Sequence, residues 1–369
     1  VDTTSEIRFD KDITVDFNGK KIENTADLWD TKNAEGKTVV SVISVNGNVT
    51  FKGNGKVVAK QDDCYAVNVL GGALTIEDGE YVGNISAVQV QAGALAIKGG
   101  KFSQRQESSY GDTYLINCID SAYKDGSANV AISGGTFAGF DPNVAPEQKV
   151  DGKAPSFAAP GTGVTKNEDG SFMAAAGMTA QILDKNGNSV KAYNTLADAV
   201  AAAEDGQTVT LLGDVEQNSQ LTIDKSITLD LNGKIIKISG YTANKAQVSV
   251  KGDLTIQDSS EAQTGKICSD YTGVSGRVVS VENGGKLTIE GGTITTEGMS
   301  NSGSAVYIAS GAEVNMTGGT VRVDAKRMNF AMNVKGSTGV FVMSGGSVIA
   351  EAGDGTETNI TAISGISSS

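Results

Sequence analysis

The feature that most constrains the fold of this chain is a short phrase that recurs along it. In this phrase an alternating apolar strand is followed by Gly-Gly and a second short strand. It occurs as LAIKGGKF (95–102), VAISGGTF (130–137), LTIEGGTI (287–294), VNMTGGTV (314–321) and FVMSGGSV (341–348), and LTIEDGEY (74–81) has the same form with one Gly replaced. A strand–turn–strand unit repeated along a chain indicates a stacked repeat architecture.

The spacing of the phrases predicts the size of one repeat. Gly291, Gly318 and Gly345 follow one another at intervals of 27 residues, whereas Gly99 and Gly134 are 35 residues apart. A coil of three strands and three turns needs roughly 20–27 residues. Another alternating strand precedes each phrase, such as SAVYIASGA at 304–312. We therefore expect a three-sheeted parallel β-helix, with an insertion over 103–127.

A longer duplication divides the chain into two modules. IRFDKDITVDFNGKKIE begins at Ile7 and LTIDKSITLDLNGKIIK begins at Leu221, 214 residues later, and nine of the seventeen positions are identical. All four prolines lie between these modules, within 141–163, which indicates a linker or a pinned loop. We predict a first module over 1–140, a Pro-rich linker with hairpins over 141–190, and a second module over 191–369.

One segment, 194–206, has the pattern of an α-helix. Asn194 or Thr195 can cap its start and Gly206 can end it, while Leu196 and Val200 belong to one apolar face. We expect this short helix to cover the open end of the second β-helix. The first module has no such segment and 361–369 reads as the opening strand of another coil, so we expect the chain to be a piece of a longer array.

Composition narrows the classes of partner. The net charge of −13 disfavours binding to nucleic acid, whose phosphates require Lys and Arg. No apolar run approaches the ~18 residues that span a membrane, so no membrane insertion is expected. Ten Phe, nine Tyr and one Trp in 369 residues argue against a core of large interlocking rings. The three separated cysteines are expected to be small apolar core residues.

Two further segments carry a resemblance to a known family. GGTFAGFDPN (134–143), with its later NEDGSF strand, and YNTLADAVAAAEDGQTVTLLGDV (193–215) resemble the pectate-lyase-like right-handed parallel β-helix modules of gut-bacterial surface proteins. Similar modules occur in phage virion proteins. The resemblance implies an all-β chain of two tandem right-handed parallel β-helix modules (solenoids), with one short capping α-helix before the second. It implies little about activity, because this fold serves lyases, hydrolases, adhesins and fibres.

The residues needed for the fold's usual chemistry are missing. The chain contains no His, which removes His-based nucleophilic, acid–base and metal chemistry. Asp62-Asp63 is the single Asp-Asp pair, and we interpret it as part of a turn. Two alternatives remain. The chain could be a glycosidase that uses two carboxylates, or its acidic turns could bind Ca²⁺, although the nonapeptide signature of Ca²⁺-loaded β-rolls is absent. We predict that the chain is not an enzyme and has no cofactor.

Ligand binding is expected where the repeat is interrupted. The 103–127 insertion carries Tyr110, Tyr114 and Tyr123, and the loop over 24–37 carries the only tryptophan, Trp29. Aromatic rings of this kind can stack on sugars. The alternative is that the tyrosines cover a coil edge and that Trp29 plugs an uncapped end.

These observations favour a non-catalytic extracellular scaffold or stalk of a bacterial cell-surface adhesin-like protein, with a loop that binds glycan or protein. The expected partners are a host or environmental glycan or surface protein, neighbouring modules of the same chain, and further copies associated end to end. The alternatives are a phage virion fibre or capsid-decoration protein, in which case the location is the virion, and a carbohydrate-active lyase or hydrolase of the β-helix type.

Overall fold

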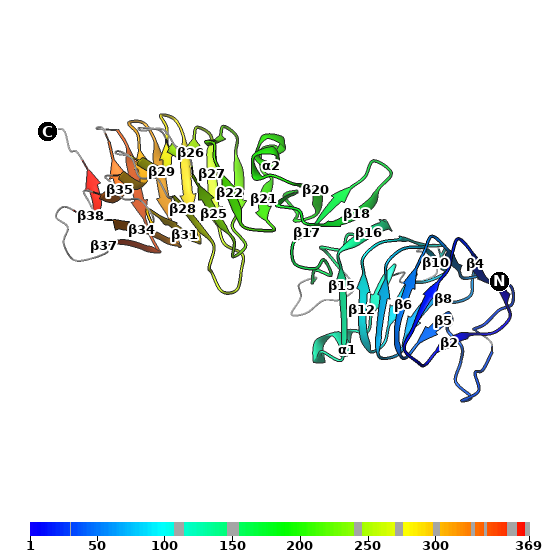
Figure 1. Ribbon diagram of the computed structural model, residues 1–369. Coiled ribbons are helices and arrows are strands. Elements are labelled where there is room, and N and C mark those ends of the chain that lie inside the picture. Colours follow the sequence, from blue (N-terminus) through cyan, green and yellow to red (C-terminus); the bar gives the residue numbers. More distant parts are fainter. Residues whose placement is uncertain are drawn as a thin grey trace. The chain divides into compact units, whose positions relative to one another are not determined.

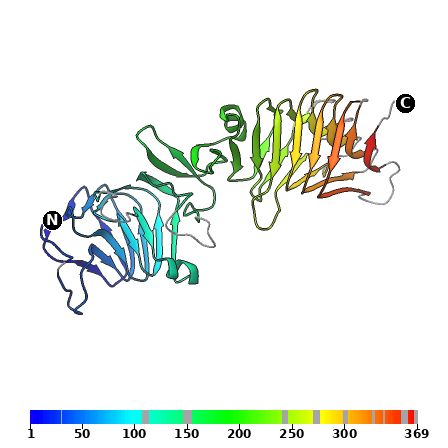
Figure 2. The same ribbon diagram turned by 180° about the vertical axis from the view of Figure 1, so that it is seen from behind.

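The computed structural model describes residues 1–29, 31–106, 114–145, 155–239, 246–269, 276–297, 303–325, 329–335, 338–352 and 360–365. The chain divides into two compact units (Figures 1 and 2). The first contains Val1–Gly177 with Asn188–Lys191, and the second contains Met178–Gly187 with Ala192–Ser369. Strand β20 (Ser189–Tyr193) contains residues of both.

The first unit is built from three sheets. The first sheet has the order β1 (Asp2–Thr3), β4 (Lys21–Asn24), β7 (Lys56–Val58), β10 (Glu80–Gly83), β13 (Lys101–Gln104), β16 (Gly134–Ala138), β18 (Ser171–Ala176) and β17 (Thr162–Lys166). The second has the order β14 (Ile116–Cys118), β11 (Val88–Val90), β8 (Tyr65–Val69), β5 (Ser41–Val45) and β2 (Ile7–Phe9). The third has the order β15 (Ala128–Ile132), β12 (Gly93–Ile97), β9 (Ala73–Ile76), β6 (Asn48–Lys52) and β3 (Ile13–Asp16).

The second unit repeats this arrangement. Its first sheet runs through β19 (Ala180–Leu183), β21 (Thr208–Leu211), β24 (Ile227–Asp230), β27 (Asp253–Gln257), β30 (Lys286–Ile289), β33 (Glu313–Met316) and β36 (Val340–Met343). Its second contains β22 (Val215–Gln217), β25 (Ile235–Ile238), β28 (Lys266–Ser269), β31 (Thr293–Thr295), β34 (Thr320–Ala325) and β37 (Ser347–Ala352). Its third contains β23 (Leu221–Ile223), β26 (Ala246–Val250), β29 (Gly276–Val281), β32 (Gly303–Ile308), β35 (Asn329–Val334) and β38 (Ile360–Gly365).

Each stacked strand therefore pairs with the strand three places before it in the chain. This pairing is parallel throughout the stacked strands. In β12 and β15, for example, Leu95 pairs with Val130 and Ile97 with Ile132. The predicted hairpin after the first stack is also present, since β17 and β18 pair antiparallel. The alternating apolar positions face inward and are buried, as Leu95 and Ile97 are. The predicted all-β class with stacked parallel sheets is confirmed.

The duplicated segments form the same turn in both units. Asn18 and Asn232 have φ values of 44° and 45°, and the glycines that follow them have φ values of 71° and 73°. In each copy the Asn N–H donates to the aspartate two residues before it, at 2.9 Å for Asp16 and 3.0 Å for Asp230. Asn and Gly tolerate this left-handed backbone better than other residues, which explains why Asn-Gly recurs there.

A buried carboxylate, Asp258, organises a neighbouring turn of the second unit. Its oxygens accept hydrogen bonds from the N–H groups of Gly233 (2.8 Å), Ser260 (3.1 Å) and Gly265 (2.5 Å), and from the Ser260 hydroxyl (2.7 Å). Burial opposes ionisation, but these four hydrogen bonds outweigh it, so the pKa of Asp258 is lowered. This acidic residue stabilises the fold and has no free oxygen for chemistry.

The sequence predicted a core without large aromatic rings, and the core of the first unit shows that this was wrong. Four rings stack in succession, Phe51 on Tyr81, Tyr81 on Phe102 and Phe102 on Phe137, with interplanar angles of 14°, 12° and 8°. Tyr81, Phe102 and Phe137 occupy paired positions of β10, β13 and β16. A few aromatic residues suffice to form this column, because parallel pairing places equivalent positions of successive strands of the sheet next to one another.

The described residues include two helices. The predicted helix is α2 (Leu196–Ala202), whose N-cap Thr195 accepts a hydrogen bond from the Asp198 N–H. Its buried face contacts β19 and β21. The expectation of one helix was wrong, because α1 (Asp120–Asp125) lies inside the predicted insertion and ends at Gly126 in a left-handed conformation. This segment of six residues is too short to show the apolar periodicity of a helix in the sequence.

Candidate functional site

A cleft in the first unit lies where the strands of the first sheet end. Its volume is about 720 Å³, and it is lined by Asp27, Trp29, Lys60, Gln61, Asp62, Asp63, Asn84, Ile85 and Gln106. These residues come from the loop after β4, the turn between β7 and β8, the turn after β10 and the segment after β13. Parallel stacking places the carboxyl ends of β4, β7, β10 and β13 at one edge, so residues far apart in sequence meet there.

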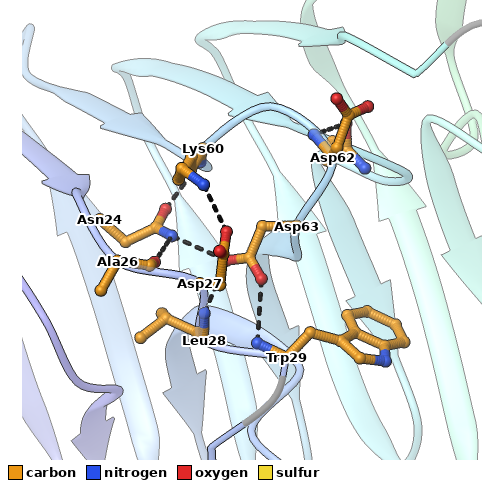
Figure 3. A network of polar contacts seen from close by, with 9 residues as sticks. Asn24, Ala26, Asp27, Leu28, Trp29, Lys60, Asp62 and Asp63 are labelled. Atoms are coloured by element: carbon orange, nitrogen blue, oxygen red, sulfur yellow. Dashed lines mark hydrogen bonds and ion pairs between the residues drawn. The ribbon is translucent and has the colours of Figure 1, made fainter.

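The buried carboxylate of Asp63 forms the base of this cleft. It accepts hydrogen bonds from the Asn24 amide at 2.7 Å and from the backbone N–H groups of Leu28 and Trp29 at 3.0 and 2.9 Å (Figure 3). The side chain of Asp63 is 4% exposed. Its oxygens are therefore committed to holding the loop that carries Trp29.

Two buried asparagines connect neighbouring turns of the cleft. The Asn24 side chain accepts the Lys60 N–H at 2.7 Å and donates to the Ala26 carbonyl at 2.8 Å. The Asn84 side chain accepts the Asp62 N–H at 3.0 Å and donates to Gln106 at 3.2 Å. Buried amides with these partners hold the backbone of the turns in the positions that form the cleft.

Asp62 differs from its neighbour Asp63 in every respect that matters for binding. It has a left-handed backbone with φ of 61°, and it is exposed. Figure 3 shows its carboxylate pointing away from the Asp63 network. The predicted turn at Asp62-Asp63 is confirmed, and it directs the Asp63 carboxylate inward and leaves the exposed Asp62 carboxylate at the rim of the cleft.

A surface ion pair borders the cleft. The Lys60 ammonium group donates to the Asp27 carboxylate. This hydrogen bond raises the pKa of Lys60. Since both side chains are well exposed, the pair contributes little to stability, but it neutralises the charge of Asp27.

Trp29 presents a partly free aromatic ring to the cleft. Its side chain is 37% exposed. Its ring meets that of Tyr65 edge to face, with centroids 5.8 Å apart and planes at 74°. Tyr65 is partly buried, which raises its pKa. The indole is thus supported on one side and accessible on another.

The three tyrosines of the predicted binding insertion have different surroundings. Tyr123 of α1 is half-buried against Phe157, with centroids 5.8 Å apart, and burial raises its pKa. Tyr114 is half-buried before β14, and Tyr110 lies outside the described residues. Among the four candidates, Trp29 lines the cleft. Asn84 and Gln106 were not identified as cleft residues from the sequence. A signal was present, because Asn24 ends β4 and Asn84 follows β10, which are equivalent strands of the first sheet.

A second cavity, of about 570 Å³, lies in the second unit and is lined by Gln220, Ala246, Ser249, Lys251, Arg277, Glu282 and Asn283. The Arg277 guanidinium lies 3.5 Å from the centroid of the Tyr307 ring, a favourable cation–π contact. The lining of this cavity carries two cationic side chains, Lys251 and Arg277, and one acidic side chain, Glu282, so the cavity contains charges of both signs.

The three cysteines are buried and form no disulfide bond with one another. Burial raises the pKa of Cys64, and raises that of Cys118 to about 11, so neither is an activated nucleophile. In the part of the chain that the structure describes, no group of three or more Cys, Asp or Glu is placed to hold a metal ion. None of the described helices has the length and apolar character to cross a membrane.

Comparisons of the chain with protein-family models, with curated proteins and with solved structures found no match. The cleft, rather than any relative, therefore carries the functional interpretation.

Proposed function

We propose that the chain folds as two tandem right-handed parallel β-helix modules and acts as a non-catalytic, extracellular scaffold of a bacterial cell-surface adhesin-like protein. In this role the first module presents the Trp29 cleft to a binding partner. The observation that carries the proposal is the stack of parallel strands with a cleft at one sheet edge, lined by a partly exposed indole. Solenoids commonly use such loop-lined surfaces for binding.

The use of the carboxylates supports binding over catalysis. A glycosidase needs two carboxyl groups that can reach the same bond, one of them able to donate a proton. In the cleft, Asp63 is held by three donors and Asp27 is paired with Lys60. Of the three acids that line the cleft, Asp62 is the one whose carboxylate receives no hydrogen bond or ion pair from the residues that the structure describes. One free carboxylate can orient a ligand but does not make the pair that hydrolysis requires.

The test combines a binding assay with an activity assay. Beads carrying the chain should be retained on surfaces coated with mixed mucin and plant or bacterial polysaccharides, and beads carrying Trp29→Ala should be retained less. The same polysaccharides should show no new reducing ends and no unsaturated uronides after incubation. Equal retention of the two proteins, or any cleavage product, would overturn the proposal.

A further inference from the structure

We infer that the Trp29 cleft binds an uncharged pyranose unit of a glycan, with the sugar ring on the indole and its hydroxyl groups on the Asp62 carboxylate. This inference rests on the proposed function, because it names the ligand class of the same cleft. It follows from the different tasks of the residues that line the cleft.

The polar groups divide into those that build the cleft and those that face a ligand. Asp63, Asn24 and Asn84 are buried and make hydrogen bonds within the protein. Asp62 and Gln61 are exposed at the lip of the same turn. An ionised carboxylate accepts hydrogen bonds only, so the ligand must supply donors at this point. Neighbouring hydroxyls of a sugar are suitable donors.

The indole supplies the second half of the recognition. An amphipathic ring that is partly exposed and packed against Tyr65 offers apolar surface to a ligand. Because the N–H groups of Leu28 and Trp29 are tied to Asp63, little ordering is required when a ligand arrives. A flat ligand with an apolar face and polar edges, as a pyranose has, suits a cleft whose lining includes both an aromatic ring and an exposed carboxylate.

Size and charge narrow the class of sugar. The cleft volume of about 720 Å³ lies within the usual range of roughly 300–1,000 Å³ for small-ligand sites. Lys60 and Asp27 neutralise each other, which leaves the negative charges of Asp62 and Asp63. An acidic sugar would therefore be repelled, whereas an uncharged sugar meets no such penalty.

The experiment is calorimetric titration of the full chain with three groups of oligosaccharides: neutral hexose oligomers, oligouronides and cationic chitosan oligomers. We expect binding to a neutral oligomer and none to the oligouronides. Asp62→Asn should weaken that binding by about tenfold, and Trp29→Ala should abolish it, whereas Trp29→Phe should keep part of it. Glu77→Gln, at an exposed acid outside the cleft, should bind like the unmodified chain.

Thermal unfolding of each variant separates lost binding from lost folding. Binding of oligouronides, binding of chitosan oligomers alone, or unchanged affinity in folded Asp62→Asn would overturn the inference. If beads show Trp29-dependent retention on mixed polysaccharides but no neutral oligomer binds, the ligand class is wrong and the proposed scaffold function stands. If retention does not depend on Trp29, the proposed function itself fails.

Discussion

The rings of Phe102 and Phe137 stack with their centroids 5.0 Å apart and their planes 8° apart. These residues hold paired positions of β13 and β16. Adjacent strands of a sheet lie about 4.8 Å apart, which is close to the separation of two stacked rings. Parallel pairing thus brings the aromatic residues at equivalent positions of β10, β13 and β16 into one column.

Phe102 should be a large contributor to the stability of the first unit, since it is 2% exposed and contacts a ring on each side. Phe102→Ala is expected to lower the free energy of unfolding by about 3–5 kcal/mol, and Phe102→Leu by less because it leaves a smaller cavity. Guanidinium unfolding of the chain measures both. The matched control is Met173→Ala at an exposed site, and an equal effect of Met173→Ala and Phe102→Ala would contradict the prediction.

Asp62 and Asp63 should respond differently to the same substitution. Asp63→Asn replaces one accepting oxygen by a donor that faces existing N–H donors, and should cost about 2–3 kcal/mol of unfolding free energy. Asp62→Asn should change it by no more than about 0.5 kcal/mol, because Asn tolerates the left-handed backbone at this position. Urea unfolding followed by Trp29 fluorescence tests the pair. Similar losses in both variants would show that Asp62 also has a structural task.

Asp258 should make the stability of the second unit depend on acid pH. Its pKa is lowered in the folded protein, so its ionised form stabilises the fold above the unfolded-state pKa of about 3.9. That stabilisation should be lost as pH falls through the lowered folded-state pKa. Asp258→Asn should therefore be less stable than the unmodified chain at pH 7, and the difference should shrink below about pH 4. A difference that stays constant from pH 7 to pH 3 would exclude this source of stability.

The three cysteines should be protected from thiol reagents. All are buried, and burial raises the pKa of Cys64 and Cys118, which lowers the thiolate fraction that reacts. Ellman's reagent at pH 8 should modify none of them quickly in the native chain and all three in guanidinium. Rapid reaction of Cys64 in the native chain would mean that the turn next to Asp63 opens. The variant Cys64→Ala shows which part of the reaction comes from Cys64.

The repeat pattern was sufficient to predict the parallel sheets. Alternation in phrases such as LAIKGGKF specifies strands with one buried face, and a constant interval brings each phrase next to its equivalent in the following coil. The Asn-Gly turns of the duplication were also predictable, because few residues adopt the left-handed conformation of Asn18 and Asn232. Local preference and periodicity act over a few residues, so they can be read along the chain.

The cleft could be predicted only in part. Trp29 was a candidate because it is the single tryptophan in a loop that interrupts the repeat, but Lys60, Asn84 and Gln106, which line the same cleft, follow other strands of the sheet. Nothing along the chain indicates that Asp63 turns inward to hold the Trp29 loop while Asp62 turns outward. That distinction depends on the amide of Asn84, 22 residues away, accepting the Asp62 N–H.

The sequence by itself thus determined the class of structure: the alternating strands, their stacking into parallel sheets, the turns between them and the tandem duplication. Tertiary structure alone decided which rings form one column, which acids are structural and which residues surround the indole. The physical reason is that strand and turn formation follow local backbone preferences, whereas burial and hydrogen-bond partners are decided only when distant strands stack into sheets.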